Sequence, residues 1–264
     1  MNHTSVAIIC SAALSATSFA AVSVTGHYQL GEAGSVGASV PFTPLNDSVG
    51  SNHITNFQNA NGGSEAIITN GLAAPGSTAA LQIVNGSNAS GWFSSSTYGY
   101  TSDFAFDIYL RPDTFDGDND IALGTNGNST NALTIGFTSS GEWVLTNASD
   151  LINDPDRIQG GSAALGAWSK LSVISYAGTV YFYVDGTEIG NTTGLASEFD
   201  APRLGFSSGA FNGADVSFDE FTVYKFDSSV DSLDSVQEFM SVPEPSATAL
   251  LGLGAIGLFL RRRR

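Results

Sequence analysis

One stretch, Trp168–Gly190, restricts the fold of this chain more than any other. Two runs in it, Leu171–Ser175 and Val180–Val184, consist mostly of β-branched and aromatic residues joined by a short glycine-containing loop, which predicts a β-hairpin. If the last residue of the first run pairs with the first residue of the second, side-chain alternation produces two different faces. One face carries Leu171, Val173, Phe182 and Val184, and the other carries Ser172, Ile174, Tyr181 and Tyr183. The first face needs a second sheet to cover it, whereas the second tolerates water or a ligand, so the hairpin predicts one layer of a β-sandwich.

The remainder of residues 22–232 agrees with this prediction. Asp185-Gly186 follows the hairpin at once and supplies the positive φ of a tight turn. Phe104–Leu110 predicts a half-buried strand, because four large apolar residues alternate with smaller or polar ones. The chain has 30 glycines and only 13% charged residues, which is typical of β-proteins with many turns. These features predict an all-β domain.

Three stretches together resemble laminin-G-like (concanavalin A-like) jelly-roll domains. The Trp168 hairpin, with its Val-Tyr-Phe-Tyr-Val-Asp-Gly strand, is similar to the central hairpin of that family. Phe218–Tyr224 is similar to its closing strand, and His27–Glu32 followed by Leu45–Gly50 is similar to its opening strand and Asp-Ser-x-Gly turn. The resemblance implies a two-sheet antiparallel jelly-roll sandwich, expected over residues 22–232.

The C-terminal end carries a tripartite signal. Pro243, Glu244 and Pro245 disfavour helix and strand and are followed by 15 largely apolar residues, Ser246–Leu260. This apolar segment predicts a short transmembrane helix, whose span is sufficient if terminal arginine side chains snorkel. Those arginines are Arg261, Arg262, Arg263 and Arg264, expected on the cytoplasmic side. The arrangement over 242–264 resembles the PEP-CTERM sorting signal of Gram-negative bacteria. The resemblance implies processing by an exosortase-type membrane protease, after which the protein resides at the cell surface or in the extracellular matrix.

The other end predicts export. Residues 1–21 combine an apolar run, Val6–Leu14, with small residues around Ala20, as in a secretory signal peptide, although no Lys or Arg precedes the run. The only cysteine, Cys10, falls within this leader, so the mature chain is expected to contain no disulfide. Residues 233–241 are expected to be a spacer between the sandwich and the sorting signal, and a short helical turn over Leu233–Met240 is the alternative.

The formal net charge of −16 limits the partners of the chain. Four of the nine Lys and Arg residues are the terminal arginines, so the body is more acidic still. Such a body is expected to repel nucleic acid and anionic membrane surfaces. It attracts divalent cations or basic partners, or it serves only to keep an exported β-protein soluble.

The densest acidic run is a candidate calcium site. It contains Asp113, Asp116, Asp118 and Asp120. Clustered carboxylates on a glycine-bearing loop suit Ca²⁺, although the spacing is not that of an EF-hand, and a solvated acidic loop is the alternative. Laminin-G-like domains often bind calcium at a sheet edge, so the resemblance is consistent with a calcium site in this chain. Asp150, Asp154 and Asp156 form a second, weaker candidate.

Catalysis is not expected. Glucanases of the same fold use two carboxylates from one strand, commonly spelled Glu-x-Asp-x-x-Glu, and no such string occurs in this chain. Asp219 and Glu220 are adjacent, so a regular strand would direct them to opposite faces. His27 and His53 lie near no Gly-x-Ser-x-Gly motif.

Glycan binding is better supported, because sugar sites combine aromatic rings with polar side chains. The candidate ring residues are Tyr109, Trp143, Tyr181 and Tyr183, although rings on sandwich strands also fill core rims. We therefore expect an exported, non-enzymatic protein that is structural, adhesive or glycan-binding in an extracellular polysaccharide matrix. The alternatives are a calcium-dependent lectin-like module and, at a distance, a polysaccharide-degrading enzyme.

Overall fold

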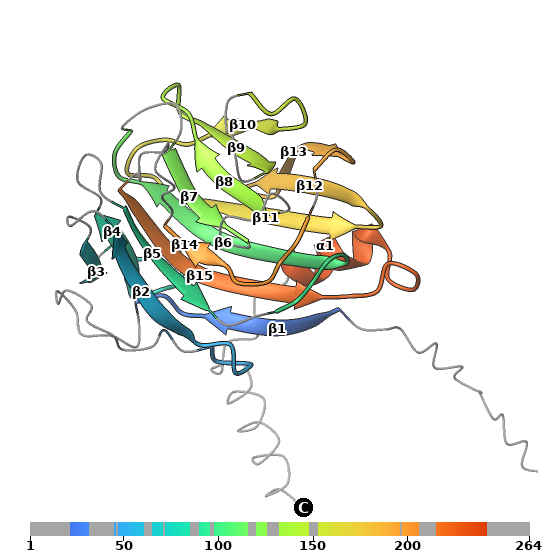
Figure 1. Ribbon diagram of the computed structural model, residues 1–264, viewed down its shortest axis with the longest axis horizontal. Coiled ribbons are helices and arrows are strands. Elements are labelled where there is room, and N and C mark those ends of the chain that lie inside the picture. The colour runs from blue at the N-terminus through green and yellow to red at the C-terminus, as the bar shows by residue number, and fades with distance from the viewer. Residues whose placement is uncertain are drawn as a thin grey trace, which may run out of the picture.

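The computed structural model describes residues 22–31, 45, 47–60, 65–70, 72–84, 90–95, 98–115, 120–125, 132–147, 153–195, 197–205 and 215–241. In this part of the chain two antiparallel sheets pack face to face (Figure 1). The eight-stranded sheet contains, in spatial order, β13 (Thr187–Thr192), β12 (Thr179–Val184), β11 (Ser169–Tyr176), β6 (Phe104–Pro112), β15 (Val216–Lys225), β4 (Ala79–Val84) and β3 (Glu65–Asn70), with β1 (Ser23–Tyr28) also paired to β15. The seven-stranded sheet contains β10 (Ile158–Ser162), β9 (Glu142–Asn147), β8 (Leu133–Phe137), β7 (Asp120–Gly124), β14 (Arg203–Leu204), β5 (Ser90–Ser95) and β2 (Ile54–Ala60). The predicted all-β, two-sheet antiparallel jelly-roll sandwich is confirmed.

The hairpin β11–β12 has the predicted register. Ser175 pairs with Val180, and the four residues of the apolar face lie in the core between the sheets. Asp185 and Gly186 have φ angles of 50° and 78°, so the turn after β12 requires the left-handed conformation that this dipeptide readily adopts. Local pattern alone therefore predicts the register of this hairpin.

Strand β15 changes its neighbour halfway along its length. Its first residues pair with β4 and its last residues pair with β1, and a bulge lies between them at Glu220, whose φ is 46°. The Asp219 carboxylate accepts hydrogen bonds from the Ala74 N–H at 2.9 Å and from the Ser77 hydroxyl at 3.2 Å, both in the segment before β4. Glu220 instead contacts His27 of β1, with 2.8 Å between Oε2 and Nε2. The strand is therefore irregular at this point, and the bulge lets each carboxylate hold a different neighbouring segment.

Asp219 and Asp47 make the stability of the fold depend on pH in opposite directions. Burial raises the pKa of Asp219 to about 6, although its hydrogen-bond donors act to lower it. Burial also raises the pKa of Asp47, but four backbone N–H donors outweigh it and leave this pKa below 3.8. The folded chain thus holds the Asp219 proton more tightly than the unfolded chain, and stability from this group grows as pH falls from 7 to 5. Stability from Asp47 is lost only as pH falls below 3.8 through the lowered pKa.

We therefore expect the free energy of unfolding in urea to rise between pH 7 and pH 5, with Asp219 contributing about 1 kcal/mol over that range. In Asp219→Asn this part of the slope should disappear, while the decline in stronger acid persists. Equal slopes in the parent chain and the variant would contradict the assignment to Asp219.

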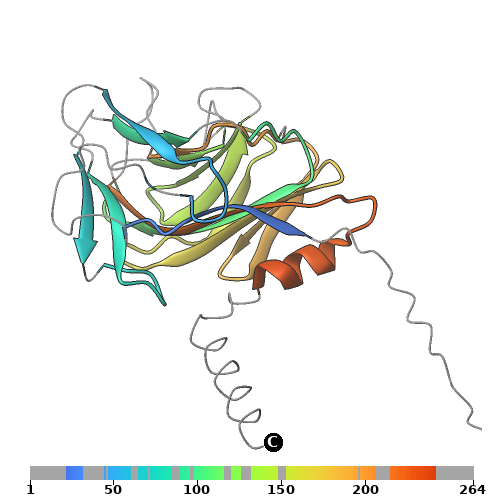
Figure 2. The same ribbon diagram turned by 90° about the horizontal axis from the view of Figure 1, so that it is seen from below.

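The segment predicted to be a spacer is a helix, α1 (Leu233–Ser241), which lies against the outside of the eight-stranded sheet (Figure 2). Its N-terminus is capped by the Ser232 hydroxyl, which accepts the Ser235 N–H at 3.2 Å. Val236 and Met240 are buried on the outer face of the sheet, in a cluster that includes Ile174. The segment is therefore the helical alternative and not a free spacer, because these two residues, four apart, give it an apolar face that packs on the sheet.

The terminal signals lie outside the described residues, as do the apolar segment Ser246–Leu260 and the arginines after it. Within the described residues, α1 is the helix present, and it is neither long nor apolar enough to cross a membrane.

Candidate functional site

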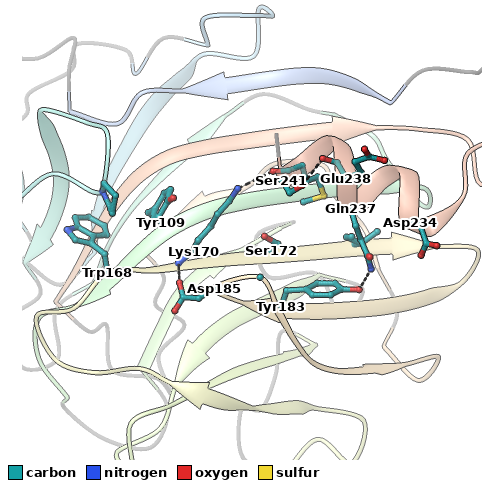
Figure 3. A pocket seen from close by; sticks show the side chains of 14 residues that line it. Tyr109, Trp168, Lys170, Ser172, Tyr183, Asp185, Asp234, Gln237, Glu238 and Ser241 are labelled. Carbon is teal, nitrogen blue, oxygen red and sulfur yellow. Dashed lines mark hydrogen bonds between the residues drawn. The ribbon is translucent and has the colours of Figure 1, made fainter. Parts of the chain in front are cut away.

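A cavity of about 780 Å³ lies between the outer face of the eight-stranded sheet and α1 (Figure 3). The lining side chains come from three places. Strands β6, β11 and β12 contribute Tyr109, Lys170, Ser172, Ile174 and Tyr183, the flanking loops contribute Pro75, Trp168, Asp185 and Gly186, and α1 contributes Asp234, Gln237, Glu238, Met240 and Ser241. This is the sheet face on which the sequence places tyrosines, so the expected polar-tipped surface becomes the floor of a concave site.

The floor is held by a buried charge network. The Lys170 Nζ lies 2.9 Å from Oδ2 of Asp107, which also accepts a hydrogen bond from the Tyr224 hydroxyl at 3.0 Å. Burial raises the pKa of Asp107, and the Lys170 ammonium opposes that effect. Lys170 also donates to the backbone carbonyl of Met240 at 3.2 Å, so the same ammonium stabilises the C-terminal end of α1.

The far wall is held through Tyr183. Gln237 on α1 donates a hydrogen bond to the Tyr183 hydroxyl, which also lies 3.4 Å from the Glu188 carboxylate. Burial raises the pKa of Tyr183 to about 12, and the charge of Glu188 adds to the effect. Tyr183 is therefore a neutral phenol at physiological pH and joins the sheet to the helix.

Two half-buried aromatic rings lie at the other end of the cavity. Figure 3 shows Trp168 and Tyr109 at this end, the α1 side chains at the opposite end, and Lys170 and Asp185 between them. Asp185 is exposed and accepts the Lys170 backbone N–H at 2.8 Å, which fixes the turn at the cavity rim. An aromatic surface beside exposed polar groups is the arrangement that accepts an amphipathic, hydroxyl-rich ligand.

The four ring residues predicted to bind glycan are separated by the fold. Tyr109 and Tyr183 line the cavity, whereas Tyr181 packs against the outer-face cluster without lining it. The structure does not support Trp143 as a ligand-binding residue. Its ring is fully buried between the sheets, and its indole N–H donates to the Ser162 carbonyl at 3.0 Å, so it presents no face to a ligand. Trp168 was not among the predicted residues. Its position directly before the strand was the signal, since it places the ring at the sheet end beside Tyr109.

The calcium candidates are only partly within the described residues. Asp113 pairs with Arg111 Nε at 3.2 Å and accepts hydrogen bonds from Gln82 and Ser217 at 3.0 and 2.7 Å. Asp116 and Asp118 lie outside the described residues, and so does the side chain of Asp120. In the second candidate, Asp150 is likewise outside, while Asp154 accepts hydrogen bonds from Thr146 and from the backbone N–H groups of Asn147 and Asp156. Among the described residues no three His, Cys, Asp or Glu side chains gather as metal ligands, and calcium binding stays a prediction.

Three side chains near β1 form a hydrogen-bonded row of the kind found in hydrolases, namely Ser48, His27 and Glu220, but their surroundings do not support catalysis. Ser48 Oγ lies 3.0 Å from Nδ1 of His27, and Nε2 of His27 lies 2.8 Å from Glu220. The backbone N–H of Ser48 donates to the His27 carbonyl, and those of the next two residues donate to the Asp47 carboxylate. These three N–H groups are therefore not available to stabilise an oxyanion beside Ser48.

Comparison with protein-family models gives two matches. Residues 75–232 match the concanavalin A-like lectin/glucanases superfamily, and residues 241–264 match the PEP-CTERM protein-sorting motif. No curated protein sequence matches the chain.

Among solved structures, the chain is similar to Domain 4 of AbnA, a GH43 extracellular arabinanase from Geobacillus stearothermophilus, solved in complex with arabinotriose. The identity is 16%, the TM-score is 0.53, and the match covers 78% of this chain and 94% of that one. Cellulose induced protein Cip1 is 15% identical with a TM-score of 0.48, over 64% of this chain and 90% of that one. A mutant Trypanosoma rangeli sialidase displaying trans-sialidase activity is 14% identical with a TM-score of 0.47, over 83% of this chain but 34% of the sialidase. At 16% identity, the similarity to the arabinanase domain shows the fold alone.

Proposed function

This chain belongs to the concanavalin A-like lectin/glucanases superfamily, and from that membership we propose that it is a non-catalytic carbohydrate-binding protein of the bacterial cell surface or extracellular matrix. The sorting motif at residues 241–264 indicates an exported, exosortase-processed protein of a Gram-negative-type bacterium. The ligand would then be an extracellular polysaccharide, which the chain meets once it is outside the cell.

The observation that carries this proposal is the cavity under α1. A pyranose ring has an apolar face that packs on an aromatic ring and a hydroxyl-bearing edge that needs hydrogen bonds. Trp168 and Tyr109 offer the rings, and Asp185 and Gln237 offer polar groups within the same cavity. The buried charge network and α1 hold the floor and the far wall in place before a ligand binds, which lowers the entropic cost of binding.

The test is a glycan array followed by titration calorimetry with the purified exported chain. We expect selective binding to a defined glycan, and Trp168→Ala should weaken it about tenfold or more, because a central aromatic contact accounts for much of the affinity at such sites. Phe239→Ala is the matched control, since Phe239 is an exposed aromatic residue of α1 that does not line the cavity. An array without any binder, or full affinity in a folded Trp168→Ala variant, would overturn the proposal.

A further inference from the structure

The charges around the cavity specify the class of sugar. We propose that the cavity selects a polysaccharide with free amino groups, such as a glucosamine polymer, over neutral and acidic chains; this inference rests on the proposed carbohydrate-binding function. Three exposed carboxylates lie around the cavity: Asp185 at the turn after β12, and Asp234 and Glu238 on α1. Among the described residues that line the cavity, Lys170 is the only cation.

Lys170 cannot serve as an anchor for an acidic sugar. Its Nζ is already paired, 2.9 Å from the Asp107 carboxylate and 3.2 Å from the Met240 carbonyl. Only 5% of the Asp107 side chain is exposed, so turning the ammonium toward a ligand would leave a buried carboxylate without its cation. A uronate in this cavity would therefore meet three carboxylates, while the cation of the lining is already balanced by Asp107, in a chain whose net charge is −16.

The α1 carboxylates are available to a ligand. Neither the Asp234 nor the Glu238 carboxylate has a hydrogen-bond or ion-pair partner among the described residues, whereas one oxygen of Asp185 accepts the Lys170 backbone N–H. An ammonium group would form charge-assisted hydrogen bonds with these carboxylates that an N-acetylated group cannot form. Because these carboxylates are on exposed side chains, salt should screen the affinity gained when they pair with an ammonium group.

The aromatic end of the cavity distinguishes a sugar from a basic peptide. Trp168 and Tyr109 lie at the end away from α1, so a ligand that spans the cavity must pack a flat apolar face on the rings while its cations reach the carboxylates (Figure 3). An amino-sugar chain has both features in every residue, because its amino groups project from the ring edge. A lysine-rich peptide has the cations without the flat rings.

The inference is tested by measuring affinities of the purified exported chain for three oligosaccharides of equal length: glucosamine oligomers, the same oligomers N-acetylated, and galacturonate oligomers. At low salt we expect the glucosamine oligomers to bind about tenfold more tightly than the N-acetylated ones and the galacturonate oligomers not to bind. Asp234→Asn/Glu238→Gln should weaken glucosamine binding about five- to tenfold and leave N-acetylated binding within about twofold. High salt should remove the difference between the two amino-sugar forms.

The matched control, Asp200→Asn/Asp227→Asn, removes two negative charges from partly or fully exposed residues that do not line the cavity and should leave the selectivity unchanged. Equal affinity for the two amino-sugar forms, together with Trp168-dependent binding of the neutral form, would overturn the charge inference and leave the carbohydrate-binding proposal standing. Binding of oligolysine that matches the glucosamine affinity and is unaffected by Trp168→Ala would overturn it in favour of a basic peptide. If no oligosaccharide binds and the glycan array also shows no binder, both the charge inference and the carbohydrate-binding proposal are wrong.

Discussion

Replacing Phe199 by alanine is expected to lower the free energy of unfolding by about 3 to 5 kcal/mol, the usual cost of deleting a buried phenylalanine ring. Phe199 is fully buried, and its ring centroid lies 5.1 to 6.4 Å from five other aromatic rings. These rings belong to Tyr98, Tyr100, Phe104, Phe106 and Phe221. The truncation leaves a cavity at the point where β6, β15 and the segment before β14 meet, and the surrounding strands can collapse into it only partly.

Urea unfolding at pH 7 measures this loss, and Phe239→Ala provides the same chemical change at an exposed position. We expect the control to cost less than about 1 kcal/mol, because Phe239 remains 41% exposed. Similar losses in the two variants would mean that the aromatic cluster around Phe199 is not the packed centre of the sandwich.

The contrast between Phe199 and the hairpin shows which parts of the fold local sequence can predict. In β11 and β12 the alternation of side chains and the turn dipeptide fix the register within one short stretch. Phe199 stands in a segment without alternation, and it is held by a two-residue bridge to Tyr100, with both backbone hydrogen bonds at 2.8 Å. Four of its five aromatic partners lie between Tyr98 and Phe106, far away in sequence, so no local pattern identifies it as core.

The bulge in β15 was unpredictable for a related reason. Positive φ is usually assigned from glycine or asparagine, and here a glutamate adopts it. The cause is tertiary: Asp219 and Glu220 hold two different segments at the place where the partner of β15 changes. A strand pattern reports alternation and burial, but not a change of neighbour.

The candidate site was half predictable. Tyr109 and Tyr183 were identified because alternation directs them away from the core. The wall formed by α1 was not, since a short polar segment before a Pro-Glu-Pro signal resembles a linker and its stability comes from the sheet beneath it. Because the packing of α1 on the sheet was not predicted, no pattern in the sequence placed the carboxylates of Asp234 and Glu238 near the tyrosines.

Replacing Lys170 by methionine is expected to lower the free energy of unfolding by about 3 to 5 kcal/mol near pH 8, because it leaves the Asp107 carboxylate buried without its cation. The hydroxyl of Tyr224 remains a donor at 3.0 Å but carries no charge to balance the carboxylate. Without the ammonium, burial raises the pKa of Asp107 further, so the folded variant takes up a proton more readily than its unfolded chain. Its stability should therefore fall as pH rises above the range of an ordinary carboxyl group, and the variant should come closest to the parent chain in weak acid.

The double variant Asp107→Asn/Lys170→Met separates the buried charge from the other contact of Lys170, the hydrogen bond to the Met240 carbonyl at the end of α1. Both variants lose that hydrogen bond, but only the single variant keeps the unpaired carboxylate. We expect the double variant to recover most of the lost stability and its pH dependence to return to that of the parent chain, as measured by urea unfolding between pH 5 and pH 8. Equal losses in the two variants at every pH would place the cost in the end of α1. Lys170 would then be free to turn toward a ligand, and the cavity would not exclude acidic sugars.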